Sequence, residues 1–158
     1  MAAASLVATA IGIVLLIVTA YVLVGGTLTA TETLMNAQSE MTDTRTRMLG
    51  TSVTITGWNG TVNPLLLDVE NTGSEAIMDL EFMDVFLLHD ATPIRYPYSE
   101  SGLTGSWSSV SISPDLIHPG QWDPNETLHI QVQYEAGSPV PVWAEVVTGN
   151  GAVDSTYL

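Results

Sequence analysis

No charged residue precedes Glu32, and this constrains the fold more than any other feature of the chain. Within that stretch residues 6–24 are almost wholly apolar. About 20 apolar residues, rising about 1.5 Å each in a helix, cross a bilayer core of about 30 Å. The apolar residues follow no 3.6-residue period. The stretch therefore predicts a helix that is surrounded on all sides by lipid or by other helices.

Three environments compete for this helix. A cleavable signal peptide needs a basic start, and Met-Ala-Ala-Ala-Ser offers none. An ordinary membrane anchor usually has Lys or Arg on its cytoplasmic side, and none precedes the span. In the third environment the segment leaves the membrane and packs into the core of a helical polymer. A basic leader has then already been removed, so Met1 need not be the initiator. The stretch alone favours anchor and polymer core equally, ahead of a signal peptide.

Beyond Gly25-Gly26 the helical pattern continues with a narrower apolar stripe. Helix-compatible residues run to Leu49, and Gly50 is a predicted C-cap. We therefore expect one helix over about residues 3–49, about 70 Å long and more than twice what a bilayer requires. Each of the two glycines costs a helix about 1 kcal/mol against alanine. They mark either a tolerated weak point at a membrane interface or a bend.

Residues 50–158 have the alternation and turn signals of short strands. The strong Asn-Thr-Gly-Ser turn signal at residues 71–74 is one example. The crowded apolar run at 81–89 indicates a central strand or a bulge, and two prolines make 93–98 an edge strand. The predicted strands are 53–55, 65–70, 76–79, 81–89, 93–98, 107–112, 128–134, 140–147 and 153–158. The fold class is α+β, a helix over residues 1–49 and an immunoglobulin-like β-sandwich over 50–158.

Composition excludes several classes of function. The formal net charge of −14 repels nucleic acid and suits an acidic, solvated outer surface. The absence of cysteine excludes disulfides, thiolate metal sites and cysteine nucleophiles. No nucleophile or phosphate-loop motif is present, so we expect neither an enzyme nor a cofactor.

The three histidines, His89, His118 and His129, fall in different segments without metal-ligand spacing. His129 alternates with the apolar face of its strand and is expected to point outward. Three acidic residues offer oxygen ligands near one another in sequence, without a calcium-loop pattern. Either they form a weak divalent-cation site or, as we favour, they serve as turn and cap residues. They are Asp115, Asp123 and Glu126.

Two further sets of residues are candidates for function. The sequons at Asn59 and Asn125 lie beside turn signals, where an exported domain presents glycans to solvent. Small residues spaced by four form a smooth ridge on which another helix can approach closely. Alanine richness in an apolar helix explains the same pattern without a partner. The predicted polymerisation residues are Ala4, Ala8, Gly12, Leu16, Ala20, Gly25 and Gly26.

An uncharged N-terminal helix, an amphipathic continuation and an all-β domain together resemble the archaeal type IV pilin superfamily. This superfamily includes archaellins, adhesive pilins and stator-like proteins of the archaellum. The local matches are the helix at 2–26, the Leu-Leu-Leu-Asp-Val-Glu-Asn-Thr-Gly stretch at 65–73, and residues 84–88. The chain departs from the family pattern at Ser5, where bacterial pilins carry glutamate, and it lacks an archaellin-like Gly-Leu-Glu-Ala-Ala start.

The resemblance implies a membrane-inserted precursor, removal of a leader and extraction into an extracellular filament. We therefore expect a structural subunit that forms a homopolymer through its N-terminal helix, with the β-domain on the outer surface. Surface-layer protein is a further candidate partner, and nucleic acid is not expected as one. The alternative is a membrane-anchored, stator-like protein whose β-domain binds the surface layer.

Overall fold

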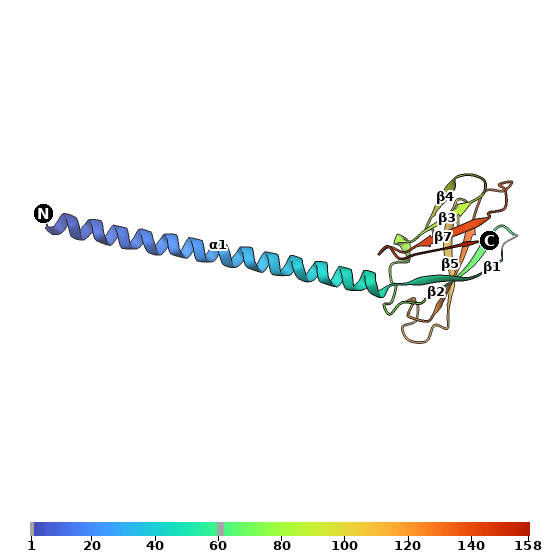
Figure 1. Cartoon of the computed structure of the whole chain (residues 1–158), viewed down its shortest axis with the longest axis horizontal. Coiled ribbons are helices and arrows are strands. Elements are labelled where there is room, and N and C mark those ends of the chain that lie inside the picture. The colour runs from blue at the N-terminus through green and yellow to red at the C-terminus, as the bar shows by residue number, and fades with distance from the viewer. Residues whose placement is uncertain (1, 60–61) are drawn as a thin grey trace. The chain divides into compact units, whose positions relative to one another are not determined.

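The computed structural model describes the backbone of residues 2–59 and 62–158, and the side chains of residues 6–59 and 62–158. Within these residues one long helix, α1, is followed by eight strands (Figure 1). The chain forms two compact units, Met1–Thr44 and Arg45–Leu158. The predicted fold class, a long N-terminal helix followed by a β-sandwich, is confirmed.

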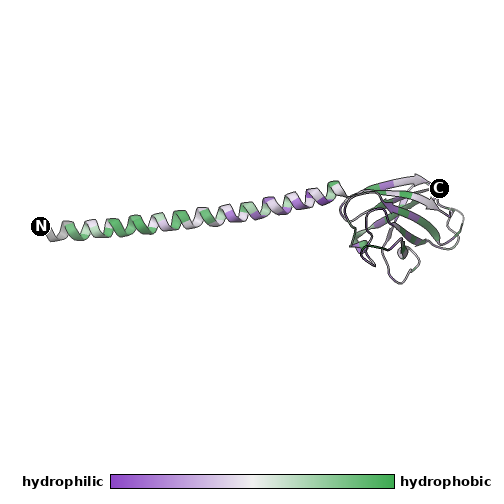
Figure 2. Cartoon of the chain, turned by 90° about the horizontal axis from the view of Figure 1, so that it is seen from below, coloured by the Kyte–Doolittle hydropathy of each residue, from purple (hydrophilic) through white to green (hydrophobic). Residues whose placement is uncertain are grey.

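Helix α1 spans Ala2–Gly50, one residue longer at each end than the sequence predicts. It continues through Gly25 and Gly26 without a break. Figure 2 shows that the first half of the helix is hydrophobic and that the second half alternates between polar and apolar residues. The sequence change at the glycines is therefore a change in the surface of one helix.

The eight strands form two four-stranded antiparallel sheets, in the orders β1-β2-β6-β5 and β4-β3-β7-β8. Lettered A to G in chain order, with β4 as C′, these are the ABED and C′CFG sheets of the immunoglobulin topology. The strands are β1 Val53–Trp58, β2 Leu65–Asn71, β3 Asp84–Leu88, β4 Pro93–Pro97, β5 Ser106–Ser113, β6 Thr127–Gln133, β7 Trp143–Val147 and β8 Val153–Tyr157.

Most of the predicted strands are present, and the one at 76–79 is wrong. Ile77 makes only an isolated bridge to Trp122, and a short 3₁₀ helix, η1 Leu80–Phe82, follows. Its apolar residue Phe82, counted in the sequence as part of the next strand, is 65% exposed. Without it β3 alternates regularly between the core and the outer face. The predictions that β3 is central and β4 lies at an edge are confirmed.

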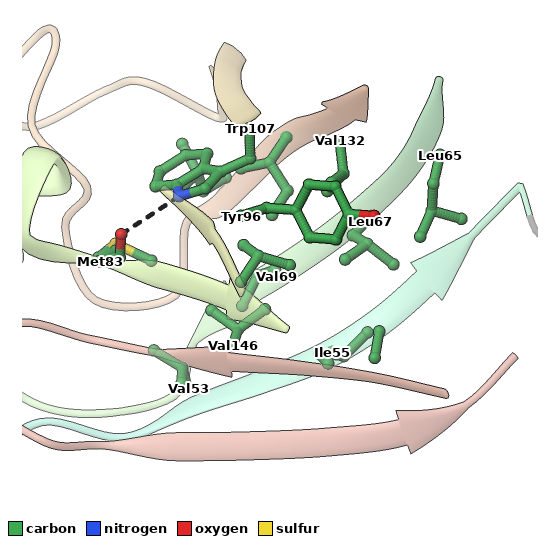
Figure 3. Packing of buried hydrophobic residues seen from close by; sticks show 14 of the residues in the cluster. Val53, Ile55, Leu65, Leu67, Val69, Met83, Tyr96, Trp107, Val132 and Val146 are labelled. Atoms are coloured by element: carbon green, nitrogen blue, oxygen red, sulfur yellow. Dashed lines mark hydrogen bonds between the residues drawn. The ribbon is translucent and has the colours of Figure 1, made fainter. Parts of the chain in front are cut away.

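The core lies between the two sheets and takes alternate residues from each strand (Figure 3). Strands β2 and β6 contribute the side chains of Leu65, Leu67, Val69, Leu128, Ile130 and Val132, all nearly inaccessible to solvent. Trp107 and Trp122 are fully buried. The Trp107 indole Nε1 donates a hydrogen bond to the carbonyl oxygen of Met83 at 3.2 Å, so one large apolar ring is packed and its polar atom satisfied.

A side-chain hydrogen bond joins the two sheets through their edge strands β1 and β8. A carboxylate oxygen of Asp154 on β8 accepts a hydrogen bond from the backbone nitrogen of Ile55 on β1 at 2.7 Å. Ile55 borders the β-bulge in β1, where the register to β2 shifts before Gly57. The carboxylate thus satisfies a backbone donor on a strand edge.

Candidate assembly interface

Helix α1 exposes its apolar side chains along the whole described length in the single chain. Leu16 is 70% exposed and Leu23 is 67% exposed, and the more polar half exposes Met35 at 65%. The helix is long and apolar enough to cross a membrane. At about 25 cal/mol per Å², leaving such a surface in water costs tens of kcal/mol. The helix therefore requires an apolar environment that the single chain does not supply.

The predicted polymerisation ridge lies in the N-terminal half of this helix. Ala8, Gly12, Leu16 and Ala20 occupy an i±4 row, the kind of row that packs into the groove of a neighbouring helix. A Cβ atom added at Gly12, Gly25 or Gly26 meets no atom within 4 Å. Nothing within the chain therefore requires glycine at these positions. The side chain of Ala4 lies outside the described residues.

Threonine hydroxyls in the helix bond to the helix's own backbone. The hydroxyl of Thr29 donates to the carbonyl of Gly25 at 3.1 Å, and the hydroxyls of Thr31 and Thr33 likewise donate to carbonyls four residues back. Thr19 and Thr27 also bond to carbonyls one turn back. These bonds satisfy the hydroxyls inside the helix, so the side chains present mainly their methyl groups. Helical periodicity in the sequence did not indicate this ladder.

The C-terminal end of α1 is tied to two loops of the sandwich unit. The carbonyl of Gly50 accepts hydrogen bonds from the backbone nitrogens of Ser74 at 2.7 Å and Glu75 at 3.3 Å. The Thr51 hydroxyl donates to the Arg47 carbonyl at 2.8 Å and accepts a hydrogen bond from the amide of Asn150. These contacts satisfy carbonyls that a helix end leaves free.

A glycine makes this junction possible. A Cβ atom at Gly73 would overlap the carbonyl oxygen of Gly50 and lie 2.6 Å from the backbone nitrogen of Ser52. The Asn-Thr-Gly-Ser signal in the sequence thus marks the loop that receives the end of the helix.

The acidic residues of the β5–β6 loop hold backbone donors. Asp123 accepts from the backbone nitrogen of His118 at 3.0 Å, and Glu126 accepts from Leu116 at 3.1 Å and from Asp123 at 3.0 Å. Asp115 accepts from Gly120. The interpretation as turn and cap residues is therefore confirmed by their bonds. In the part of the chain that the structure describes, no three His, Cys, Asp or Glu side chains form a metal-binding group.

The histidines also have structural partners. His129 points outward as predicted and pairs with Asp68 across strands at 2.6 Å. His89 is buried, and its Nδ1 donates to the carbonyl of Pro139, which can only accept. In the neutral ring Nε2 then accepts from the hydroxyl of Tyr96 at 2.8 Å. Burial, followed by the nearby Glu135 and Tyr134, raises the pKa of Tyr96 above its ordinary value.

A family comparison agrees with this arrangement of helix and sandwich. The model of the archaeal-type flagellins matches residues 3–158, nearly the whole chain. The chain belongs to the archaeal-type flagellin family. This family is structural and non-enzymatic, so the chain is an archaellum-class protein of the cell surface rather than an enzyme. No curated protein matches the chain.

Two solved structures resemble this flagellin-family chain in fold. The archaellum periplasmic stator protein FlaG from Sulfolobus acidocaldarius matches with a TM-score of 0.52 and 18% identity, over 68% of this chain and 99% of that one. A structure of the FlaF and FlaG stator complex from the same organism gives the same TM-score and identity, over 68% of this chain and 88% of that one. At this identity the likeness concerns the fold alone.

The two sequons of this flagellin-family chain differ in their surroundings. Asn125 is exposed in the turn before β6 and has a left-handed backbone, with φ 65°. Asn59 is exposed just after β1, where its side-chain oxygen accepts a hydrogen bond from the nitrogen of Leu66 at 2.9 Å. The other two residues of the first sequon lie outside the described residues. Glycosylation at both positions stays a prediction.

Proposed function

We propose that the chain is the structural subunit of an extracellular filament, archaellum-like or pilus-like, and polymerises through α1. The membrane holds the precursor before assembly, residues 1–49 form the filament core, and residues 50–158 face outward. The observation that carries this proposal is the exposed apolar surface of a 49-residue helix. That helix is more than twice as long as a bilayer core requires.

The exposed helix can leave lipid for a bundle of copies because both environments are dry. Repeating one heterologous contact between identical subunits produces a fibre when the contact does not close into a ring. The i±4 row with open space at Gly12 supports close approach of a neighbouring helix at this level. Membership of the flagellin family supports the same conclusion.

A second candidate is a membrane-anchored, stator-like protein whose sandwich binds surface-layer protein. The likeness of fold to the stator protein FlaG favours it. The two candidates differ in where the helix ends up, in a polymer or in lipid.

The experiment is electron microscopy of surface filaments from cells that express the full chain with Gly12→Leu. Leucine removes the glycine penalty of about 1 kcal/mol in the helix and makes the segment more apolar. Membrane insertion should therefore be unimpaired. A ridge that contacts other helices closely leaves no room for leucine, so we expect filament yield to fall at least tenfold.

Ala10→Leu is the matched control, because residue 10 lies on about the opposite side of the helix from residue 12. It should reduce filament yield less than Gly12→Leu. Filaments that lack the chain, with all of it in the membrane fraction, would favour the stator-like alternative. Equal yields for both variants would exclude the ridge as the closest contact.

A further inference from the structure

The outer face of the β4-β3-β7-β8 sheet is apolar. Its side chains alternate with those of the core, and the registers between the strands place them side by side. Tyr157 is 77% exposed and Val153 is 52% exposed. The residues of this face, which we call the apolar face, are Phe86, Leu88, Pro93, Pro97, Trp143, Val147, Val153 and Tyr157, with the polar or charged Asp84, Arg95, Glu145 and Ser155 among them.

The outer face of the β1-β2-β6-β5 sheet, identified in the same way from the strand registers, is mostly polar. It carries Thr54, Thr56, Asp68, Glu70, Ser111, His129, Gln131 and Gln133. Three large apolar side chains on the strands of this sheet are exposed: Leu66 at 41%, Trp58 at the end of β1 at 42%, and Val110 at the bulge of β5 at 56%. An antiparallel sheet with one solvated side normally has this polar pattern. The apolar face departs from the pattern, as surfaces that bind a partner do.

Charge indicates which partner suits the apolar face. Arg95 pairs with Asp84 at 2.8 Å, so with Glu145 the face has a single acidic charge in excess. The whole chain has a formal net charge of −14, and copies therefore repel one another over most of their surface. Two copies can approach through the apolar face with little repulsion.

The register supplies complementarity as well. Arg95, Phe86, Glu145 and Ser155 form one row across β4, β3, β7 and β8. Consider a two-fold axis in the plane of this face, running between β3 and β7 and parallel to them. It places β4 of one copy over β8 of the other, and β3 over β7. Arg95 then lies one strand, about 4.8 Å, to the side of the other copy's Glu145.

We propose that the apolar face binds the apolar face of a second copy of this chain about such an axis. Tyr157 then packs on Pro93 of the other copy, and Trp143 packs on its Leu88. The contact is isologous, because the same patch serves on both copies. It is a sandwich-to-sandwich contact, separate from the helix contact in the proposed filament.

The size of the face sets the strength of this contact. Four strands about 4.8 Å apart, each with five residues rising about 3.4 Å, cover about 330 Å² in projection. Two copies thus bury well under the roughly 1,200 Å² of a stable interface. The pairing needs a high local concentration, which anchorage of both helices in one membrane before assembly provides. In that respect alone it rests on the proposed function.

A cysteine-free chain allows a direct test. Facing sheets lie about 10 Å apart, so a direct disulfide would not join two copies, and a short bismaleimide cross-linker is used instead. The full chain with Pro93→Cys and Tyr157→Cys is treated with it in membranes and run on a denaturing gel. The two positions lie at opposite edges of one sheet, about 14 Å apart, too far for a short cross-link within one chain. The matched control is Thr54→Cys with Ser113→Cys, which likewise lie in one row at opposite edges of the polar face. We expect at least tenfold more cross-linked dimer from the first pair.

A charge exchange tests the geometry. Arg95→Glu in the Pro93→Cys, Tyr157→Cys background should reduce the dimer severalfold, and adding Glu145→Arg should restore it. Restoration is specific to pairing with a second copy, since a bound glycan or another protein would not produce it. Dimer no more abundant than from the control pair, or no restoration, would overturn the inference. Electron microscopy of the same samples keeps this result separate from that of the filament proposal.

Discussion

The helix and the sandwich both contain many apolar residues, but only the sandwich buries them within the single chain. In the sandwich every second residue of a strand turns inward, and side chains such as Leu67 and Val85 are fully buried. In the helix side chains such as Leu16 and Leu23 stay largely exposed. Hydrogen bonds differ likewise: Thr29 bonds four residues back, whereas Asp154 bonds to Ile55, 99 residues away.

This difference separates folding from assembly. Alternate residues of the strands are apolar and are buried within one chain, which makes a stable domain. The helix has no apolar side to turn away from water, and its surface is satisfied only by lipid or by other copies. Substitutions in the sandwich should therefore change its free energy of unfolding, and substitutions in the helix should change assembly.

The largest expected contrast comes from one substitution made in both regions. Leu67→Ala should lower the free energy of unfolding of the sandwich by about 2–5 kcal/mol, because it leaves a cavity in a close-packed core. Leu15→Ala should leave that free energy unchanged. Tryptophan fluorescence during denaturant unfolding of the detergent-solubilised chain measures it, since all four tryptophans follow residue 50. Equal losses in the two variants would contradict the separation.

A second contrast uses glycine. Gly73→Ala places a methyl group against the carbonyl of Gly50 and the nitrogen of Ser52, so the sandwich should lose about 1–3 kcal/mol. Gly12→Ala meets open space and should increase helix stability by about 1 kcal/mol. The same fluorescence measurement follows the first variant and circular dichroism follows the second. A neutral Gly73→Ala would show that the junction tolerates a larger residue.

A third contrast concerns long-range and local hydrogen bonds. Asp154→Ala leaves the Ile55 nitrogen without its side-chain partner and should cost the sandwich about 1 kcal/mol. Thr31→Val removes a bond within one helical turn and should not affect the sandwich. Fluorescence-detected unfolding of both variants decides this. Thr156→Ala, two residues along β8 from Asp154, controls for loss of a side chain from this strand.

The smallest effect is a pH dependence found only in the sandwich. The raised pKa of Tyr96 means that the unfolded chain loses this proton at a lower pH than the folded chain does. The contribution of Tyr96 to the free energy of unfolding is fully present below pH 10.0, the ordinary pKa of this side chain. It is lost as the pH rises through the pKa that Tyr96 has in the folded chain. Tyr96→Phe should flatten this alkaline decline in unfolding free energy. A decline of the same steepness in the variant would assign it to other groups.

Much of this architecture could be predicted because its patterns are local. An uncharged apolar run predicts the helix, and alternation with turn signals predicts a segment that overlaps each of the eight strands. The segment 76–79 failed because its apolar residues serve a bridge to Trp122, a contact 45 positions along the chain that spacing does not reveal. Phe82 was assigned to a strand because it directly precedes the apolar residues of β3, whereas it lies in η1 and is exposed.

The candidate sites depended more on tertiary structure. The turn signal at Asn71-Thr72-Gly73-Ser74 was visible, while its role in receiving the end of α1 depends on the folded approach of Gly50. The apolar face was hidden because residues 81–89 read as one crowded run. Only the register shows that Phe86 and Leu88 face away from the core beside Trp143.

The bond between Asp154 and Ile55 connects the last strand of the sandwich to the first. During synthesis Asp154 leaves the ribosome after strands β1 to β7 have emerged. Until β8 docks, the edge donor of β1 must be hydrated, and β7 has no neighbour on one side. Docking of β8 is therefore the step that closes both sheets, and removal of this strand would leave both of them open along that edge.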